Sequence, residues 1–312
     1  MNQSPANSVE ETAEQRTRHG IIAALMAYTM WGLFPIYFKI VSDVEALEML
    51  AHRIVWSLPF GALIIWLRHQ WPEVKRALSH KRTFGFLALS ALVISVNWLT
   101  YIYAVQNEHI FQASLGYYIN PLVNVVLGMV FLRERLRAPQ ILAVVLATVG
   151  VIYLTVYYGE FPWIALALAV SFGLYGLIRK IAPVGSLAGL TVETLLLSIP
   201  ALVYLFYLDG QGAGHIFRVS LKVDLLLMGC ALATAIPLLF FTLGARRLYL
   251  TTVGLLQYIA PSCMFLLAVF LFREPLVKAQ VVTFIFIWTA LAIYSTDSVR
   301  YYKRAEQNLS NP

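Results

Sequence analysis

Ten apolar runs of 19–24 residues, separated by polar connections, occupy most of the 312-residue chain. A helix rises 1.5 Å per residue, so roughly 20 apolar residues are needed to cross the hydrocarbon core of a bilayer. The chain is 60% hydrophobic and 12% charged, which a soluble domain of this size could not bury in one core. The sequence therefore predicts an all-α polytopic membrane protein with ten transmembrane helices at 20–41, 45–67, 83–105, 110–132, 138–158, 162–181, 186–208, 222–244, 248–271 and 278–296.

The basic residues predict an orientation and exclude one class of partner. The net charge of +7 lies in short clusters between the apolar runs and forms no continuous stripe, so no nucleic-acid partner is expected. With the N-terminus in the cytoplasm, 17 Lys and Arg residues fall on the inner side and 5 on the outer side. The positive-inside rule then predicts cytoplasmic tails at 1–19 and 297–312. The acidic N-terminal tail and the long first apolar run argue against a cleavable signal peptide.

One stretch of the chain occurs twice, at an offset of 140 residues. Residues 113–140 align with residues 253–280. The shared positions are a Tyr-Ile pair, a proline and an Arg-Glu pair, which place Tyr118-Ile119 on Tyr258-Ile259, Pro121 on Pro261 and Arg133-Glu134 on Arg273-Glu274. Each copy has the length of a membrane span and carries its proline near the middle. We expect the two Arg-Glu pairs to fix helix ends in the interface rather than to perform chemistry.

The repeat extends beyond this stretch at an offset of 141. It places Trp31-Gly32-Leu33-Phe34 on Phe172-Gly173-Leu174-Tyr175, and Ser57-Leu58-Pro59 on Ser198-Ile199-Pro200. The chain is thus predicted to contain two five-helix repeats, 20–158 and 159–296. Because five is odd, equivalent helices must run in opposite directions. Such inverted-topology repeats are typical of secondary transporters.

Five motifs are distributed over both halves. They are Trp31-Gly32-Leu33-Phe34-Pro35, His52-Arg53 followed by Trp56-Ser57, Asn97-Trp98, Gly116-Tyr117-Tyr118-Ile119-Asn120-Pro121-Leu122 and Leu256-Gln257-Tyr258-Ile259-Ala260-Pro261. Together with the five-plus-five repeat, they resemble the RarD family, which sits among the EamA-type members of the drug/metabolite transporter superfamily. The resemblance covers roughly residues 18–300. It implies a bacterial inner-membrane transporter with a central cavity for a small organic solute, and the family's label is connected with chloramphenicol sensitivity.

The two repeated prolines predict a polar region near the bilayer midplane. Each lacks a backbone N–H and frees the carbonyl one turn earlier, at Tyr117 and Gln257. Polar groups in hydrocarbon need partners, so the neighbouring side chains should face the protein interior. We expect a collar around the solute formed by Tyr117, Asn120, Gln257 and Tyr258. The alternative is a pair of kinked helices whose amides, including that of Asn124, satisfy one another across a packed seam.

Arg53 lies inside the second span, where an arginine costs about 2.5–3.5 kcal/mol unless it is paired or hydrated. We predict that it binds an anionic or carboxylate group of the solute. The alternative is an arginine that reaches the headgroups or pairs with Glu48. His52 and Glu48, one turn apart, are candidate proton-binding residues. Glu193 is a third candidate because it is the repeat counterpart of His52, although a carboxyl at the cytoplasmic interface is the simpler explanation.

The third span supplies a further candidate for the cavity. Asn97 is predicted to line it, because an amide beside aromatic rings can hold a flat organic molecule by stacking and hydrogen bonds. Trp98 and Tyr101 fit either this cavity or helix packing. Trp31 is assigned by default to an interfacial belt or to packing.

The sequence gives no sign of an enzyme, a cofactor or a metal site. It contains no P-loop, HExxH motif or nucleophile elbow, and Cys230 and Cys263 both lie inside apolar runs. The leading hypothesis is a secondary transporter that exports a small solute by alternating access, with energy from the proton gradient. Alternatives are an importer, an uncoupled uniporter, or a structural or regulatory membrane protein. Convergence of Arg53, Asn97, Asn120 and Gln257 on one space would favour transport, and a monomer and a homodimer are both compatible with the sequence.

Overall fold

The computed structural model describes residues 13–40, 44–107, 109–159, 161–273 and 277–310, and these residues form helices without any strand. Ten helical spans are long and apolar enough to cross a membrane, which confirms the predicted fold class. In chain order they are α1 (Ala13–Ile40), α2 (Ala46–Leu67), α4 (Lys81–Gln106), α5 (Ile110–Leu132), α6 (Ala138–Tyr158), α7 (Trp163–Ile181), α8 (Ser186–Gly210), α9 (Leu221–Arg247), a segmented ninth span (Leu250–Leu271) and α12 (Lys278–Ser310).

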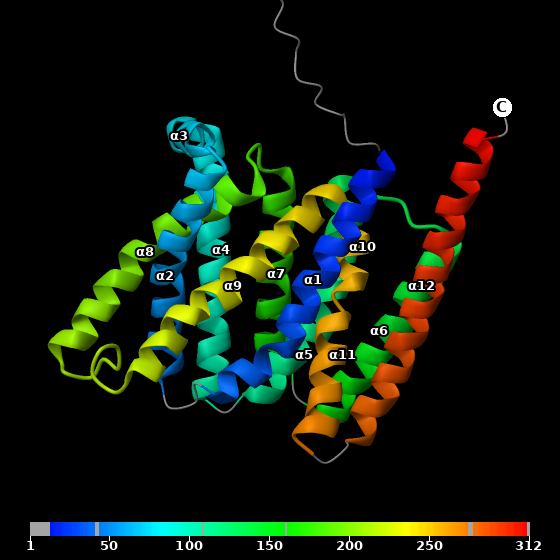
Figure 1. Ribbon diagram of the computed structural model, residues 1–312. Helices are drawn as coiled ribbons and strands as arrows, with labels where there is room; N and C mark the ends of the chain where they lie inside the picture. The colour runs from blue at the N-terminus through cyan, green and yellow to red at the C-terminus, as the bar shows by residue number, and fades with distance from the viewer. Residues whose placement is uncertain (1–12, 41–43, 108, 160, 274–276, 311–312) are drawn as a thin grey trace, which may run out of the picture.

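The spans cross the molecule in alternating directions (Figure 1). The short helix α3 (Trp71–Ser79), the start of α1 and the end of α12 lie at one face, which we call the terminal face. The start of α2 and the α8–α9 connection lie at the opposite, distal face. Helices α1 and α12 both extend into the segments predicted as polar tails, so the tails are partly helical.

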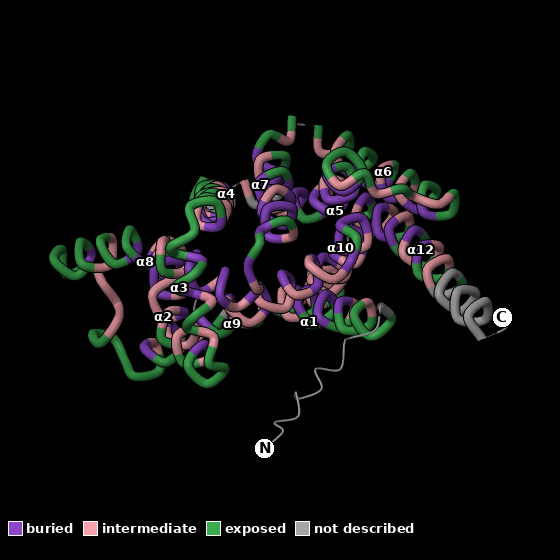
Figure 2. The backbone as a smooth tube through the Cα atoms, turned by 90° about the horizontal axis from the view of Figure 1, so that it is seen from above, coloured by how far each residue is buried: buried purple, intermediate pink, exposed green. Residues whose placement is uncertain are grey.

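The packing of the helices follows the sequence repeat. Three spans pack on their own repeat counterparts, in the pairs α2–α8, α5–α10 and α6–α12. The remaining two pairs exchange partners, because α1 packs on α9 while α4 packs on α7. A two-fold relation between the halves would generate this set of contacts. The lipid-facing surfaces of the outer helices are exposed, as the view along the helices shows (Figure 2).

The ninth span is broken where the repeated motif predicts freed backbone groups. Helix α10 (Leu250–Leu256) ends before Gln257, and α11 (Ile259–Leu266) carries Pro261 as its third residue. A π-helical turn (Leu267–Leu271) completes the span. A proline removes one helical hydrogen bond and crowds the preceding turn, which accounts for the break. In α5 the helix continues through Pro121.

The first Arg-Glu pair has the structural role that the sequence predicts. Arg133 adopts a left-handed conformation, with φ of 54°, and ends α5. The Glu134 carboxylate then accepts hydrogen bonds from the backbone N–H groups of Leu250 and Thr251, at 2.6 and 2.9 Å. A carboxylate at the N-terminus of a helix accepts hydrogen bonds from unpaired backbone N–H groups and interacts favourably with the helix dipole. Arg273 shares the left-handed conformation, with φ of 55°, while Glu274 lies outside the described residues.

Glycines allow close approach of helices, as the sequence predicts for Gly150 and Gly173. A Cβ atom on Gly150 would lie 2.9 Å from Cβ of Phe286, and one on Gly173 would lie 2.9 Å from a methyl group of Val123. Small residues at such contacts let membrane helices pack by van der Waals attraction. The α6–α12 pair therefore depends on the missing side chain of Gly150.

We expect Gly150→Leu to destabilise the protein by about 1–3 kcal/mol, because the new side chain must push α12 away from α6. Thermal unfolding in detergent should show a lower melting temperature. Val149→Leu is the matched control, since Val149 is exposed on the same helix. Equal melting temperatures for the two variants would contradict this account of the helix contact.

Candidate functional site

A large cavity lies between the two halves and has a volume of about 740 Å³. Its wall includes residues from the distal ends of α2 and α4, namely Glu45, Ala46 and Gln106. Glu45 and Gln106 are exposed, so the cavity reaches the surface at the distal face. The predicted site residues Arg53, Asn97, Tyr117, Asn120 and Gln257 all line this one space.

Aromatic rings form much of the cavity wall. Trp31, Trp98 and Tyr101, which the sequence also allows as packing or belt residues, line it together with Phe34 and Phe172. Phe34 and Phe172 were not predicted as wall residues. The repeat contained a signal for Phe172, because it is the counterpart of Trp31. These rings give the cavity flat apolar surfaces with few polar groups, as small-molecule sites commonly have.

Arg53 is the cation of the cavity wall. Its guanidinium carbon lies 4.5 Å from the centre of the Trp98 ring, in a cation–π contact. Its Nε atom has no hydrogen-bond partner among the described residues, and no described carboxylate lies within 4.0 Å of its guanidinium. Glu45 is the other charged residue of the wall and lies at the mouth, 3.4 Å from the Gln106 amide. The inner part of the cavity therefore has a positive charge that the protein leaves available.

The amides of the site join helices as well as lining the cavity. Asn97 donates hydrogen bonds to the Leu168 carbonyl and the Ser171 hydroxyl, both at 2.9 Å, which links α4 to α7. A second set links α5 to α7 and to the broken ninth span. In it, Asn120 donates to the Ala169 carbonyl at 2.8 Å, and Asn124 donates to Asn120 at 3.1 Å and to Gln257 at 2.8 Å. Asn120 and Gln257 thus line the cavity and also take part in hydrogen bonds between packed helices.

Tyr258 lies outside the cavity wall, unlike the other collar residues. Its side chain is fully buried, and its hydroxyl donates a hydrogen bond to the Tyr118 carbonyl at 3.1 Å. This contact joins the two copies of the repeated motif. The ring packs in a core cluster that also contains Leu115, Tyr118 and Val125 of α5.

His52 and Glu48 form a separate cluster toward the distal face. Both are buried, and His52 Nε2 lies 3.6 Å from Glu48 Oε1. The Glu48 carboxylate also accepts a hydrogen bond from the backbone N–H of His215 and lies 2.7 Å from His215 Nδ1. The cluster ties α2 to the α8–α9 connection, and neither His52 nor Glu48 lines the large cavity. Glu48 is therefore not the partner of Arg53.

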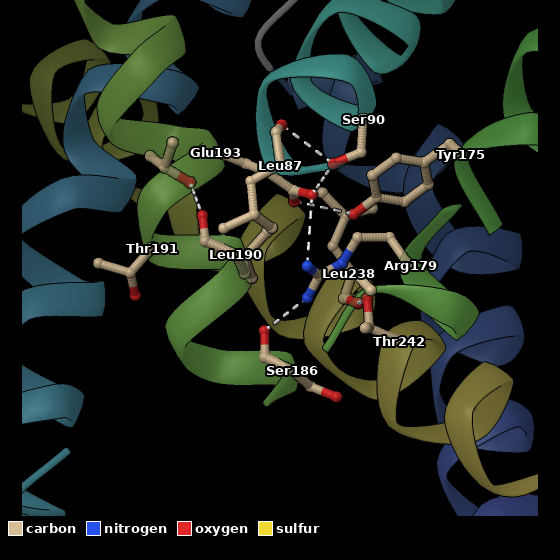
Figure 3. A network of polar contacts seen from close by, with 12 residues as sticks. Leu87, Ser90, Tyr175, Arg179, Ser186, Leu190, Thr191, Glu193, Leu238 and Thr242 are labelled. Atoms are coloured by element: carbon tan, nitrogen blue, oxygen red, sulfur yellow. Dashed lines mark hydrogen bonds and ion pairs between the residues drawn. The ribbon is translucent and has the colours of Figure 1, made fainter. Parts of the chain in front are cut away.

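Glu193 is buried near the start of α8, and Figure 3 shows its polar contacts. Its carboxylate lies 3.4 Å from the Arg179 guanidinium and accepts a hydrogen bond from the Ser90 hydroxyl. Arg179, one of the 17 Lys and Arg residues that the sequence predicts on the inner side, is 0% exposed. Its burial is possible because Glu193 supplies the opposite charge and Gly189 leaves space for the guanidinium.

Comparison with known proteins identifies the family. Residues 18–156 match the EamA-like transporter family. Protein RarD of Salmonella typhi is 47% identical over 285 residues, which cover 91% of this chain and 97% of that protein. The chain belongs to the RarD family of EamA-like transporters. An uncharacterized transporter of Vibrio cholerae is 45% identical over 287 residues, which cover 92% of this chain and 95% of that protein.

A solved crystal structure shares the RarD-family fold. It superposes with a TM-score of 0.69, covers 89% of this chain and 97% of its own, and is 18% identical in sequence. The chain is thus a multi-pass bacterial inner-membrane protein and a membrane transporter of the drug/metabolite superfamily. The names of the relatives agree with the expectation that the protein is not an enzyme.

We expect Tyr258→Phe to lower the stability by about 0.5–1.5 kcal/mol, because the variant lacks one buried hydrogen bond. Solute affinity should not change, since the ring does not face the cavity. Thermal unfolding and solute binding measure the two effects separately. Tyr117→Phe makes the same chemical change on the cavity wall and serves as the control. A loss of solute affinity in Tyr258→Phe as large as in Tyr117→Phe would contradict the placement.

Proposed function

We propose that the protein is a secondary active transporter that exports a small organic solute by alternating access, driven by the proton gradient. In this proposal, residues 20–158 and 159–296 are inverted repeats that rock against each other around the cavity. The observation that carries the proposal is the convergence of Arg53, Asn97, Asn120 and Gln257 on one cavity between the halves. The exchange of helix partners between the repeats supports the same mechanism.

The closed terminal side supports an alternating-access interpretation of this conformation. An aromatic cluster lies at the terminal end of the cavity. In this cluster Tyr175 stacks on Phe241 with ring centres 6.1 Å apart, and the Tyr28 ring lies 6.3 Å from that of Phe241. Hydrogen bonds between neighbouring segments lie closer to the terminal face. Glu73 accepts a hydrogen bond from the backbone of Gly185 at 2.6 Å, and Lys180 donates to the Ala245 carbonyl at 3.0 Å. With cytoplasmic termini, this conformation faces outward.

The cavity wall favours a flat solute with an anionic group. Aromatic rings offer stacking surfaces, and a guanidinium binds carboxylate or phosphate groups with paired hydrogen bonds. Arg53 has no carboxylate partner of its own within the described residues, so a solute anion would satisfy a charge that is otherwise costly at this depth. A volume of about 740 Å³ suits a molecule of metabolite or drug size.

The source of energy in this proposal follows from two features. The sequence has no P-loop, so an ATP-driven mechanism has no support. Buried titratable groups lie at both ends of the molecule, with His52 and Glu48 toward the distal face and Glu193 toward the terminal face. Ionisable groups inside membrane proteins commonly mark proton pathways.

We expect Arg53→Gln to weaken binding of an anionic aromatic solute by roughly tenfold or more, because a charge-assisted hydrogen bond contributes about 1.5–3 kcal/mol. A thermal-shift screen against aromatic carboxylates, amino acids, nucleosides and amphenicols identifies the solute, since selective binding stabilises the folded state. Arg53→Lys is the control and should retain part of the affinity. Equal affinity of Arg53→Gln and the unmodified protein would exclude Arg53 as the anchor.

Transport in proteoliposomes tests the coupling directly. We expect solute movement to respond to an imposed pH gradient. Because protons and solute exchange in opposite directions, the solute should accumulate on the acidic side. The control is an equal membrane potential without a pH difference. Transport that is indifferent to the pH gradient would remove proton coupling from the proposal while leaving the cavity assignment intact.

A further inference from the structure

Glu193 belongs to a buried network that joins three helices on the closed side of the cavity (Figure 3). Glu193 lies on α8, while Arg179 and Tyr175 lie on α7 and Ser90 lies on α4. The Arg179 guanidinium is 3.4 Å from the Glu193 carboxylate, the Tyr175 hydroxyl donates to it at 3.4 Å, and the Ser90 hydroxyl is a third partner. The network therefore holds α8 against α4 and α7.

The charges within this network depend on one another. Arg179 is fully buried, and its Nη2 donates to the Ser186 carbonyl at 2.9 Å. Its Nε and Nη1 atoms have no hydrogen-bond partner among the described residues, so the Glu193 carboxylate is the main compensation for its charge. Removing one partner of a buried ion pair is strongly unfavourable because the other charge stays buried and unpaired. Neutralising Glu193 would therefore favour a conformation in which Arg179 separates from it and reaches water.

A small chamber lies between this network and the solute cavity. Its volume is about 20 Å³, and its wall includes Arg53, Ser57, Glu193 and Thr194. Arg53 also lines the large cavity, so the two spaces share a wall residue. A space of this size holds one water molecule, which needs polar partners such as these. A proton that enters the open cavity therefore has a short polar route to Glu193.

The groups that face Glu193 determine when it can hold a proton. From α7 they are Arg179 and the Tyr175 hydroxyl, from α4 the Ser90 hydroxyl, and across the chamber Arg53 of α2 and Thr234 of α9. Both arginines favour the ionised carboxylate. The closed network and the ionised form of Glu193 therefore stabilise each other, and the open network and the protonated form do the same.

We propose that Glu193 is the proton-binding group of the transporter and that its ion pair with Arg179 latches the terminal side. This inference rests on the proposed proton-coupled transport. A proton from the distal side adds to a carboxylate oxygen of Glu193, the ion pair separates, and the terminal side opens. Loss of that proton to the terminal side restores the carboxylate, which attracts Arg179 and closes the latch. No covalent bond other than the O–H bond forms or breaks.

The test compares Glu193→Gln with Glu193→Asp in proteoliposomes. Glutamine cannot ionise, so we expect pH-driven solute accumulation to fall to the level without a gradient, while solute binding, measured by thermal shift, persists. Aspartate can still ionise and should retain coupling with a shifted pH midpoint. Pure structural damage would instead reduce solute binding and coupling together in both variants, and that result would overturn the proposal.

A second readout does not depend on transport. A cysteine introduced at Leu190, which lines the chamber, is labelled with a membrane-impermeant thiol reagent from the terminal face after Cys230 and Cys263 are replaced. Glu193→Gln should increase labelling several-fold at neutral pH. Unchanged labelling would exclude the latch. If the unmodified protein ignores the pH gradient, proton coupling fails together with this inference; if it responds and Glu193→Gln responds equally, this inference alone fails.

Discussion

Polar groups within the membrane-spanning part must find partners inside the protein, and the structure depends on this constraint. Hydrocarbon offers no hydrogen bonds, so each buried amide or charge has to meet another group or a wet cavity. The amides of Asn120, Asn124 and Gln257 meet across α5 and the ninth span. Arg53 instead faces the large cavity, and Glu193 meets Arg179. The location of the polar residues thus defines where the protein is packed and where it is open.

The fold was largely predictable because membrane spans leave a strong signal. All ten predicted spans appear within a few residues at most ends, since length and hydropathy alone determine whether a helix can cross the bilayer. Pro261 predicted the helix break at Gln257. The equivalent Pro121 predicted a break in α5 as well, but that helix is continuous. Local sequence identifies a possible kink, and packing against neighbouring helices determines whether it opens.

The site residues were predictable only where a polar side chain is too costly to expose to hydrocarbon. Arg53, Asn97, Asn120 and Gln257 are costly in hydrocarbon, so the sequence directed them inward and the cavity contains them all. Phe172 and Tyr258 show the limit. An aromatic ring is equally stable in a seam, a belt or a cavity wall, and only the three-dimensional arrangement separates these. Arg179 was missed because a cation near a span end normally reaches water, and its buried partner lies 14 residues away on the next helix.

Distance measurements between spin labels at the two faces test the central claim, which is that one cavity opens alternately to either side. One labelled pair joins Gln106 and Phe270 toward the distal face, and a second joins Ser79 and Arg135 at the terminal face, in a chain without its native cysteines. All four side chains are exposed. Lowering the pH should produce a second population, with a shorter distance toward the distal face and a longer one at the terminal face. Unchanged distances at both faces, with and without solute, would contradict alternating access.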